Sequence, residues 1–166
     1  MITREQTCAF TGHRPDKFPF GYDFNHPLCI EIRDRLRTAI EYEIKNGIKH
    51  FISGMAMGVD LWAAEEVLKL KQEYPHITLE AAIPCPAQSR KWPKKFQKIY
   101  SEILNLCDKK TIISTVYTPW VMQARNRYMV DKSSVLIAVY NGTSGGTQNT
   151  LLYAMSQNLR IVELSI

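Results

Sequence analysis

Short, continuous apolar runs alternate along the chain with longer segments in which apolar residues recur every three or four positions. In residues 28–46, the side chains of Ile32, Leu36, Ile40 and Ile44 fall on one face of a helix. The run VLIAVY at 135–140 is typical of a strand that is buried on both sides. The same criteria predict strands at 7–11, 48–53, 77–83, 110–114, 135–140 and 160–164, and helices at 28–46, 59–74, 88–106, 120–132 and 147–157.

This alternation of strands and helices predicts the fold class. Apolar strands that are each followed by a helix indicate a parallel sheet covered on both faces. We therefore expect a single Rossmann-like α/β domain, spanning 1–166, with a mostly parallel sheet of about six strands and helices on both faces. In such sheets, ligands bind beyond the carboxyl ends of the strands. The loops that begin at Gly12, Gly54 and Gly142 each follow a strand, so we expect them to meet at one edge.

Composition narrows the classes of function. The apolar fraction of 45% and the charged fraction of 22% are ordinary for a globular domain. The first residues are polar and no apolar run approaches the ~20 residues of a membrane span, so we expect no membrane association and a cytoplasmic location. None of the four cysteines forms a CxxC pair, which predicts reduced thiols and no metal site. The net charge of +5 admits an anionic partner.

The loop GTSGGT at 142–147 carries the strongest binding signal. The adjacent Gly145 and Gly146 let the backbone approach a ligand, and the helix that follows offers free N–H groups to a phosphate. Ser144 and Thr147 would add hydroxyl groups. The structural alternative is a turn in which Thr147 caps the helix, and this role is compatible with binding. We predict an anion site that begins at Gly142.

A second glycine-rich loop, SGMAMGVD at 53–60, also joins a strand to a helix. It lacks the Gly-Lys-Ser/Thr end of a phosphate-binding P-loop and the spacing of the GxGxxG dinucleotide motif. Asp60 falls in the first helical turn, where the helix dipole favours an acid. It is therefore either structural, or it accepts a ribose hydroxyl or orients Arg125. The predicted ligand contacts from this loop are Ser53, Gly54, Met55, Gly58 and Asp60.

Four further polar side chains are candidates for ligand binding. His13 and Arg14 follow Gly12 at the end of the first strand, and the planar fork of Arg14 suits a phosphate or a carboxylate. Residues 125–127 read Arg-Asn-Arg, and the two arginines diverge by roughly 160° on a helix. Only one of them can face the pocket. We choose Arg125, together with Asn126, because the next turn is apolar and defines the buried side.

The candidates for catalysis are Asp60, Glu65 and Arg125. Glu65 is an acid or base if it lies near the binding edge, and an ion-pair partner if it lies deeper in the fold. Cleavage of an N-glycosidic bond needs a carboxylate that handles an oxocarbenium-like charge or activates water. The residues alone leave open whether the protein is an enzyme.

A basic stretch at 90–98 suggests a different partner. Basic and aromatic residues alternate there, as in surfaces that contact phosphates and stack on bases of a single-stranded nucleic acid. The alternative is a solvated helix face with two buried aromatic side chains. The residues that would bind nucleic acid are Arg90, Lys91, Trp92, Lys94 and Lys95.

Several motifs in order resemble the SLOG superfamily of Rossmann-like proteins, which joins the DNA-processing protein DprA and the "lonely guy" phosphoribohydrolases. They are SGMAMGVD at 53–60, ARNR at 124–127 and SGGT at 144–147. The segments FTGHRP at 10–15 and GVDLWAAE at 58–65 look more like the YpsA-type family, also labelled DUF1273. The resemblance runs from about Thr7 to Leu164. Carried over by position, it implies a pocket lined by Gly12, Ser53, Gly54, Gly58, Asp60, Arg125, Asn126, Gly145, Gly146 and Thr147.

The resemblance implies a function, with one departure. It implies that the protein binds or senses a nucleotide or nucleotide derivative, needs no other cofactor, forms a homodimer by analogy, and acts in bacterial stress or cell division. The phosphoribohydrolases carry a glutamate three residues after the loop threonine, where this chain has Thr150. The alternatives are a phosphoribohydrolase-like enzyme that cleaves nucleoside monophosphates with Asp60 or Glu65, and a DprA-like binder of single-stranded DNA.

Overall fold

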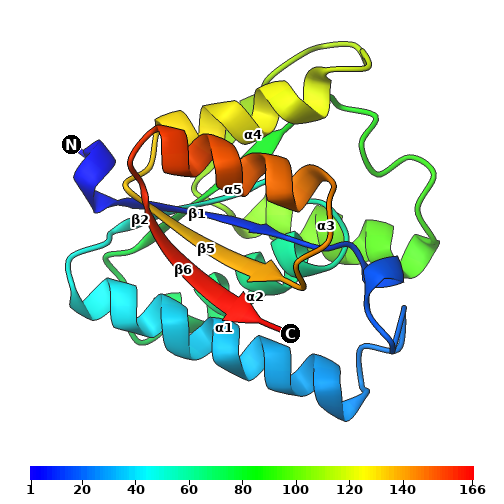
Figure 1. Ribbon diagram of the computed structural model, residues 1–166, viewed down its shortest axis with the longest axis horizontal. Helices are drawn as coiled ribbons and strands as arrows, with labels where there is room; N and C mark the ends of the chain where they lie inside the picture. Colours follow the sequence, from blue (N-terminus) through cyan, green and yellow to red (C-terminus); the bar gives the residue numbers. More distant parts are fainter.

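The computed structural model describes residues 1–166. Its six strands form one sheet in which every two neighbouring strands are parallel. The strand order is β4-β3-β2-β1-β5-β6 (Figure 1). The strands are β1 (Thr7–Gly12), β2 (His50–Ser53), β3 (Thr78–Ile83), β4 (Lys109–Ile112), β5 (Val135–Tyr140) and β6 (Arg160–Ser165). The predicted fold class is confirmed. The order turns back between β1 and β5, which is the position where sheets of this kind bind ligands.

Helices cover both faces of the sheet, as predicted. One face is packed by α1 (Pro27–Lys45), α2 (Val59–Lys71) and α3 (Lys94–Leu106), and the other by α4 (Val121–Asp131) and α5 (Gly146–Ser156). Figure 1 shows α1 below the sheet and α4 and α5 side by side above it. The first face holds 28 buried core residues and the second holds 10.

Local chemistry explains where the helices begin. α1 starts at Pro27, whose missing N–H is not needed in the first turn, and His26 Nδ1 accepts a hydrogen bond of 3.1 Å from the Leu28 N–H. α3 starts at Lys94 with Pro93 as its N-cap, so the helix predicted for 88–106 begins at the proline inside it, the alternative start in the sequence, and residues 88–93 lie outside. Two 3₁₀ turns, at Arg4–Gln6 and Pro15–Lys17, complete the structure.

A buried carboxylate network lies between β2, β3, β4 and α4. Glu80 is only 2% exposed and accepts hydrogen bonds of 2.8 Å from His50 Nε2, 2.6 Å from the Thr111 hydroxyl and 2.5 Å from the Tyr128 hydroxyl. Burial opposes the charged form, but these hydrogen bonds outweigh it and lower the pKa of Glu80 to about 2. The ionised Glu80 carboxylate therefore links the edge strand β4 to helix α4 through hydrogen bonds.

The cysteines and the helices complete the description. Cys8, Cys29, Cys85 and Cys107 are all unpaired, and burial raises the pKa of Cys8, Cys29 and Cys107. No helix has the length and apolar character that crossing a membrane requires.

Candidate functional site

A polar hollow of about 320 Å³ lies at the carboxyl end of β1, between the loops that lead into α2 and α5. These loops lie on the right in Figure 1, where the arrowheads of β1 and β5 point. Two apolar residues and eleven glycines and polar or charged residues surround the hollow, which opens to solvent: Phe10, Thr11, Gly12, His13, Arg14, Asp16, Lys17, Ala56, Asp60, Arg125, Asn126, Gly146 and Thr147.

The N-terminus of α5 opens onto this hollow without a side-chain cap. Its N-cap residue, Gly145, has a φ of 140°, which favours glycine, and no side chain bonds the first helical N–H groups. A Cβ built on Gly146 meets no heavy atom within 4 Å, so open space lies in front of the backbone. Free N–H groups and the positive end of the helix dipole at this position favour an anion.

His13 joins the end of β1 to the loop before α5. Its Nε2 accepts a hydrogen bond of 3.2 Å from the Asn141 N–H, so the proton of the neutral ring sits on Nδ1, which faces the Thr147 hydroxyl at 3.5 Å. Burial lowers the pKa of His13. The neutral imidazole therefore fixes the loop that carries the two glycines.

This geometry predicts a pH dependence of stability. Because the pKa of His13 is lower in the folded protein, the folded state favours the neutral ring, and its contribution is fully present above ~6.5 and is lost as the pH falls toward the folded pKa. Urea unfolding at pH 7.5 and 5.5 should show that wild type loses more stability than His13→Gln, by at most ~1.4 kcal/mol per pH unit. Equal losses would contradict this assignment.

Arg125 is the most buried cation of the site, with 3% of its surface exposed. Its Nη1 donates to the Gly54 carbonyl oxygen, and its Nε donates to Asn126 Oδ1 at 2.8 Å. The Gly54 carbonyl also accepts a hydrogen bond of 3.0 Å from Gln88 Nε2. A Cβ on Gly54 would lie 2.6 Å from Arg125 Nη1, so the absence of a side chain at Gly54 makes room for the guanidinium. Arg125 is thereby held rigidly at the floor of the hollow.

Asp60 is the buried acid of the site. Its Oδ2 accepts a hydrogen bond of 3.3 Å from the Ala56 N–H, and its backbone carbonyl accepts one of 2.8 Å from the Ser53 hydroxyl. Burial raises the pKa of Asp60, while the positive charge of Arg125 acts in the opposite direction. The carboxylate thus organises the β2–α2 loop and partly balances Arg125.

The structure brings eight of the predicted ligand contacts to this hollow and leaves seven outside its lining. The eight are Gly12, His13, Arg14, Asp60, Arg125, Asn126, Gly146 and Thr147. Ser53, Gly54 and Met55 are buried behind it because β2 lies inside the sheet. Gly58 is buried against the His13 carbonyl oxygen, 2.7 Å from where its Cβ would be. Gly142, Ser144 and Gly145 are exposed on the approach to α5.

Glu65 does not line the hollow. It lies half-buried further along α2, where burial raises its pKa and the charge of Arg33 on α1 opposes this shift. Of the two predicted positions, near the binding edge or deeper in the fold, Glu65 therefore occupies the deeper one. Of the three catalytic candidates, only Asp60 and Arg125 reach the hollow.

Sequence reasoning missed several members of the lining. Asp16 and Lys17 belong to the 3₁₀ turn Pro15–Lys17, which directly continues the His13-Arg14 segment. Their position after a strand was the available signal. Phe10, Thr11 and Ala56 complete the wall, and none of them carries a side chain that marks a site.

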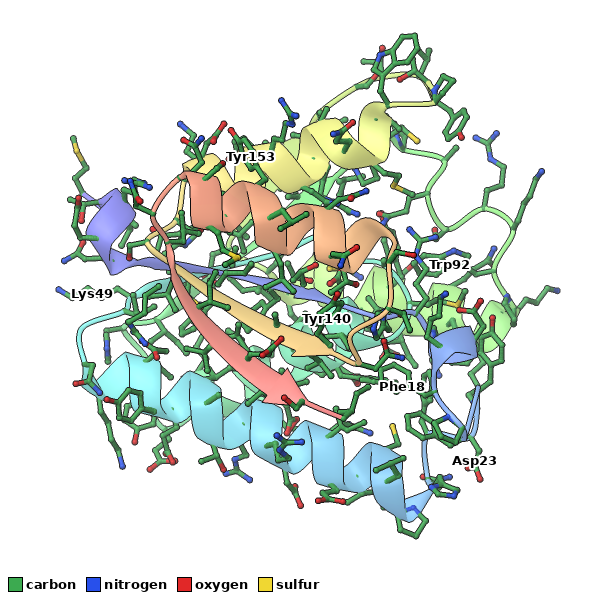
Figure 2. All side chains as sticks on the ribbon, in the orientation of Figure 1. Phe18, Asp23, Lys49, Trp92, Tyr140 and Tyr153 are labelled. Carbon is green, nitrogen blue, oxygen red and sulfur yellow. The ribbon has the colours of Figure 1, made fainter.

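The basic stretch at 90–98 lies away from this hollow. Trp92 is half-buried and packs edge-on against Tyr100, with ring centroids 5.3 Å apart, and Figure 2 labels it on the right. Phe96 is buried in the core, while Lys91, Lys94 and Lys95 are exposed. The exposed lysines and the packed aromatic rings match the structural alternative in part, because only residues 94–98 of the stretch belong to α3.

Comparison with known proteins establishes the family. A sequence profile described as the YspA SLOG family matches residues 8–163. The chain belongs to this family. It is the YpsA-type family that the sequence motifs resemble, so that resemblance is confirmed. At the position where the phosphoribohydrolases carry a glutamate, the Thr150 hydroxyl donates a hydrogen bond of 3.0 Å to the Gly146 carbonyl oxygen.

Relatives of the YspA SLOG chain are found in bacteria. The SPbeta prophage-derived protein YoqJ of Bacillus subtilis is 33% identical over 142 residues, covering 78% of this chain and 83% of YoqJ. The UPF0398 protein BH1768 of Halalkalibacterium halodurans is 32% identical over 149 residues, covering 89% of this chain and 78% of that protein.

Solved structures agree on the fold of this SLOG chain. DNA processing protein A from Helicobacter pylori, whose structure was described for its single-stranded DNA binding mode, superposes with a TM-score of 0.63 at 21% identity. The match covers 96% of this chain and 64% of that one. DprA from Streptococcus pneumoniae gives a TM-score of 0.64 at 16% identity, with 95% of this chain and 49% of that chain covered.

Proposed function

We propose that this protein binds a phosphate-bearing, nucleotide-like ligand in the hollow at the end of β1 and acts as a sensor for it. The observation that carries the proposal is the uncapped N-terminus of α5, which faces the same hollow as Arg14, Lys17 and Arg125. Backbone N–H groups and arginine forks are the donors that phosphate oxygens accept.

The charges of the lining support an anionic ligand. Three permanent cations face two acids, Asp16 and Asp60, while His13 is held neutral. Burial further disfavours the charged form of Asp60, which lowers the cost of placing an anion beside it. The site therefore has a net positive field at the position where α5 begins.

The same residues argue against hydrolysis as the main role. A glycosidic bond between a base and a sugar is cleaved most readily with a carboxylate placed at the bond. Asp60 already accepts the Ala56 N–H and faces Arg125, and position 150 carries a threonine. A DprA-like role in binding single-stranded DNA would use the same fold. The two roles differ in their ligand, which is single-stranded DNA in one and a nucleotide-like small molecule in the other.

A thermal-shift panel tests the proposal. The panel contains AMP, ADP, ATP, NAD, ADP-ribose, cyclic dinucleotides and a short single-stranded oligonucleotide. A ligand at a hundred times its Kd should stabilise the fold by ~2.7 kcal/mol, which raises Tm by several degrees. A shift with the oligonucleotide alone would favour the DprA-like role, and a flat panel would overturn the proposal.

Matched variants locate the binding. Gly146→Val places a side chain in the open space in front of α5, where an added Cβ meets no heavy atom within 4 Å, so it should abolish the shift and preserve the fold. Lys17→Ala and Lys98→Ala each remove one exposed lysine, but only Lys17 lines the hollow. We expect about tenfold weaker binding for Lys17→Ala, by the ~1.4 kcal/mol of one charge-assisted contact, and no change for Lys98→Ala.

A further inference from the structure

A second hollow, of about 290 Å³, lies between α4 and α5 and adjoins the first. The two hollows share Asn126 and Gly146, so a ligand anchored at the start of α5 can extend from one into the other. Figure 1 shows α4 and α5 side by side, and Figure 2 labels Tyr153 toward the far end of this groove. We call it the α4–α5 groove.

The chemistry of the α4–α5 groove differs from that of the first hollow. Arg127 is its one charged lining residue, whereas the first hollow has five. Three carboxamide side chains line it instead: Gln123, Asn126 and Asn149. Gln123 and Asn149 are exposed, and Asn126 uses only its Oδ1 to accept from Arg125, which leaves its NH₂ group as a donor. Carboxamides present a donor beside an acceptor, the pattern that pairs with the edges of nucleic-acid bases.

Flat surfaces accompany these amides. The Arg127 guanidinium carbon on α4 lies 4.9 Å from the centre of the Tyr153 ring on α5, so this arginine stacks over an aromatic ring where the two helices meet. Trp120, next to the lining residue Pro119, is 67% exposed. Aromatic rings and arginine planes are the groups on which bases stack. The groove thus supplies stacking surfaces as well as edge partners.

The length of the α4–α5 groove also suits a ligand that extends from a phosphate at Gly146. Gly146, Asn149 and Tyr153 lie on successive turns of one face of α5, and seven residues of helix span about 10 Å. A ligand whose phosphate sits at Gly146 would therefore pass Asn149 before it reaches Tyr153. Charge lies at the start of this path and uncharged polar groups lie along it.

We propose that the α4–α5 groove is the subsite for the base, so that the ligand class is a nucleoside phosphate rather than a bare sugar phosphate or a polyphosphate. This inference rests on the proposed function, because the phosphate at α5 sets the position of the base. Asn149 and Gln123 recognise the edge of the base, and the Arg127–Tyr153 stack supports its plane.

Calorimetric titration of the full chain with ribose 5-phosphate and with AMP, GMP, CMP and UMP tests the subsite. At least one nucleotide should bind tenfold or more tightly than ribose 5-phosphate. Asn149→Ala should reduce this ratio to within threefold and leave the affinity for ribose 5-phosphate unchanged. Gln148→Ala, which removes a neighbouring amide of α5 outside the groove, is the control and should keep the ratio.

The outcomes separate the two proposals. The first outcome is that ribose 5-phosphate binds to wild type but not to Gly146→Val, and no nucleotide binds more tightly than ribose 5-phosphate. The phosphate site then stands and the base subsite is overturned. An equal weakening of nucleotide and ribose 5-phosphate by Asn149→Ala also overturns the subsite. If none of the five compounds binds, the base subsite is overturned, and the thermal-shift panel decides the proposed function separately.

Discussion

Gly12→Ala is expected to lower the free energy of unfolding by about 2–3 kcal/mol, the range in which overpacking of a tight core falls. An added Cβ would lie 2.5 Å from three carbon atoms of Val59, the first residue of α2. Val59 is itself fully buried, so it has no space into which to retreat. β1 would therefore have to move away from α2 in the middle of the sheet. Urea unfolding monitored by circular dichroism measures the loss.

Gly146→Ala provides the matched control for Gly12→Ala. A Cβ at Gly146 meets nothing within 4 Å, and the residue occupies the first turn of α5, where alanine is a better helix former than glycine. Its stability should stay within ~0.5 kcal/mol of wild type. If Gly12→Ala proves as stable as Gly146→Ala, the close contact between β1 and α2 is refuted.

Glu80→Ala is expected to be the most destabilising of the substitutions considered, by about 3–5 kcal/mol. The change removes the acceptor shared by His50, Thr111 and Tyr128 and leaves these buried groups without their partner. Glu80→Gln keeps the shape and removes the charge, so it should be less destabilising. Urea unfolding at pH 7 ranks the two variants.

The charge of Glu80 also predicts an acid dependence. The pKa of Glu80 falls from an ordinary value of 4.5 to about 2 on folding, so its contribution is present above the unfolded pKa and is lost as the pH falls toward 2. The stability advantage of wild type over Glu80→Gln should shrink by about 2 kcal/mol between pH 7 and pH 3. Other carboxylates titrate in both proteins and cancel. A constant difference would show that Glu80 is not the charged centre of the network.

The sheet was predictable because its central strands β1 and β5 are mostly apolar and buried, although the edge strands β4 and β6 carry several polar residues. β5, with the sequence VLIAVY, is buried along almost its whole length, as a central parallel strand must be. Local patterns were less informative at proline and in the long loop. The segment 13–26 has no periodicity, so the position of Asp16 and Lys17 after a strand was the one signal that the 3₁₀ turn at Pro15–Lys17 would bring them to the hollow.

The glycines show why only part of the candidate site was predictable. Glycine serves equally where a ligand approaches and where protein atoms approach, and a sequence does not distinguish the two. A Cβ added to Gly12, Gly54 or Gly58 would lie less than 3 Å from other atoms of this chain, whereas a Cβ added to Gly146 would meet no heavy atom within 4 Å. Distinguishing the two roles required knowing which side chain lies across each glycine, and that depends on contacts between β1, α2 and α4.

The strand order has a consequence for synthesis of the chain. β1 is made first, yet β5, which pairs with it along Cys8–Gly12, begins only at Val135. At the ~5–20 residues per second of translation, one side of β1 stays unpaired for on the order of ten seconds. Arg125 emerges late in that interval and Gly146 only after it, so a chain that stops before α5 cannot present the ligand site. Translation therefore completes the hollow only after α5 has been made, and a chain that stopped before β5 would expose the edge of β1 to other strands.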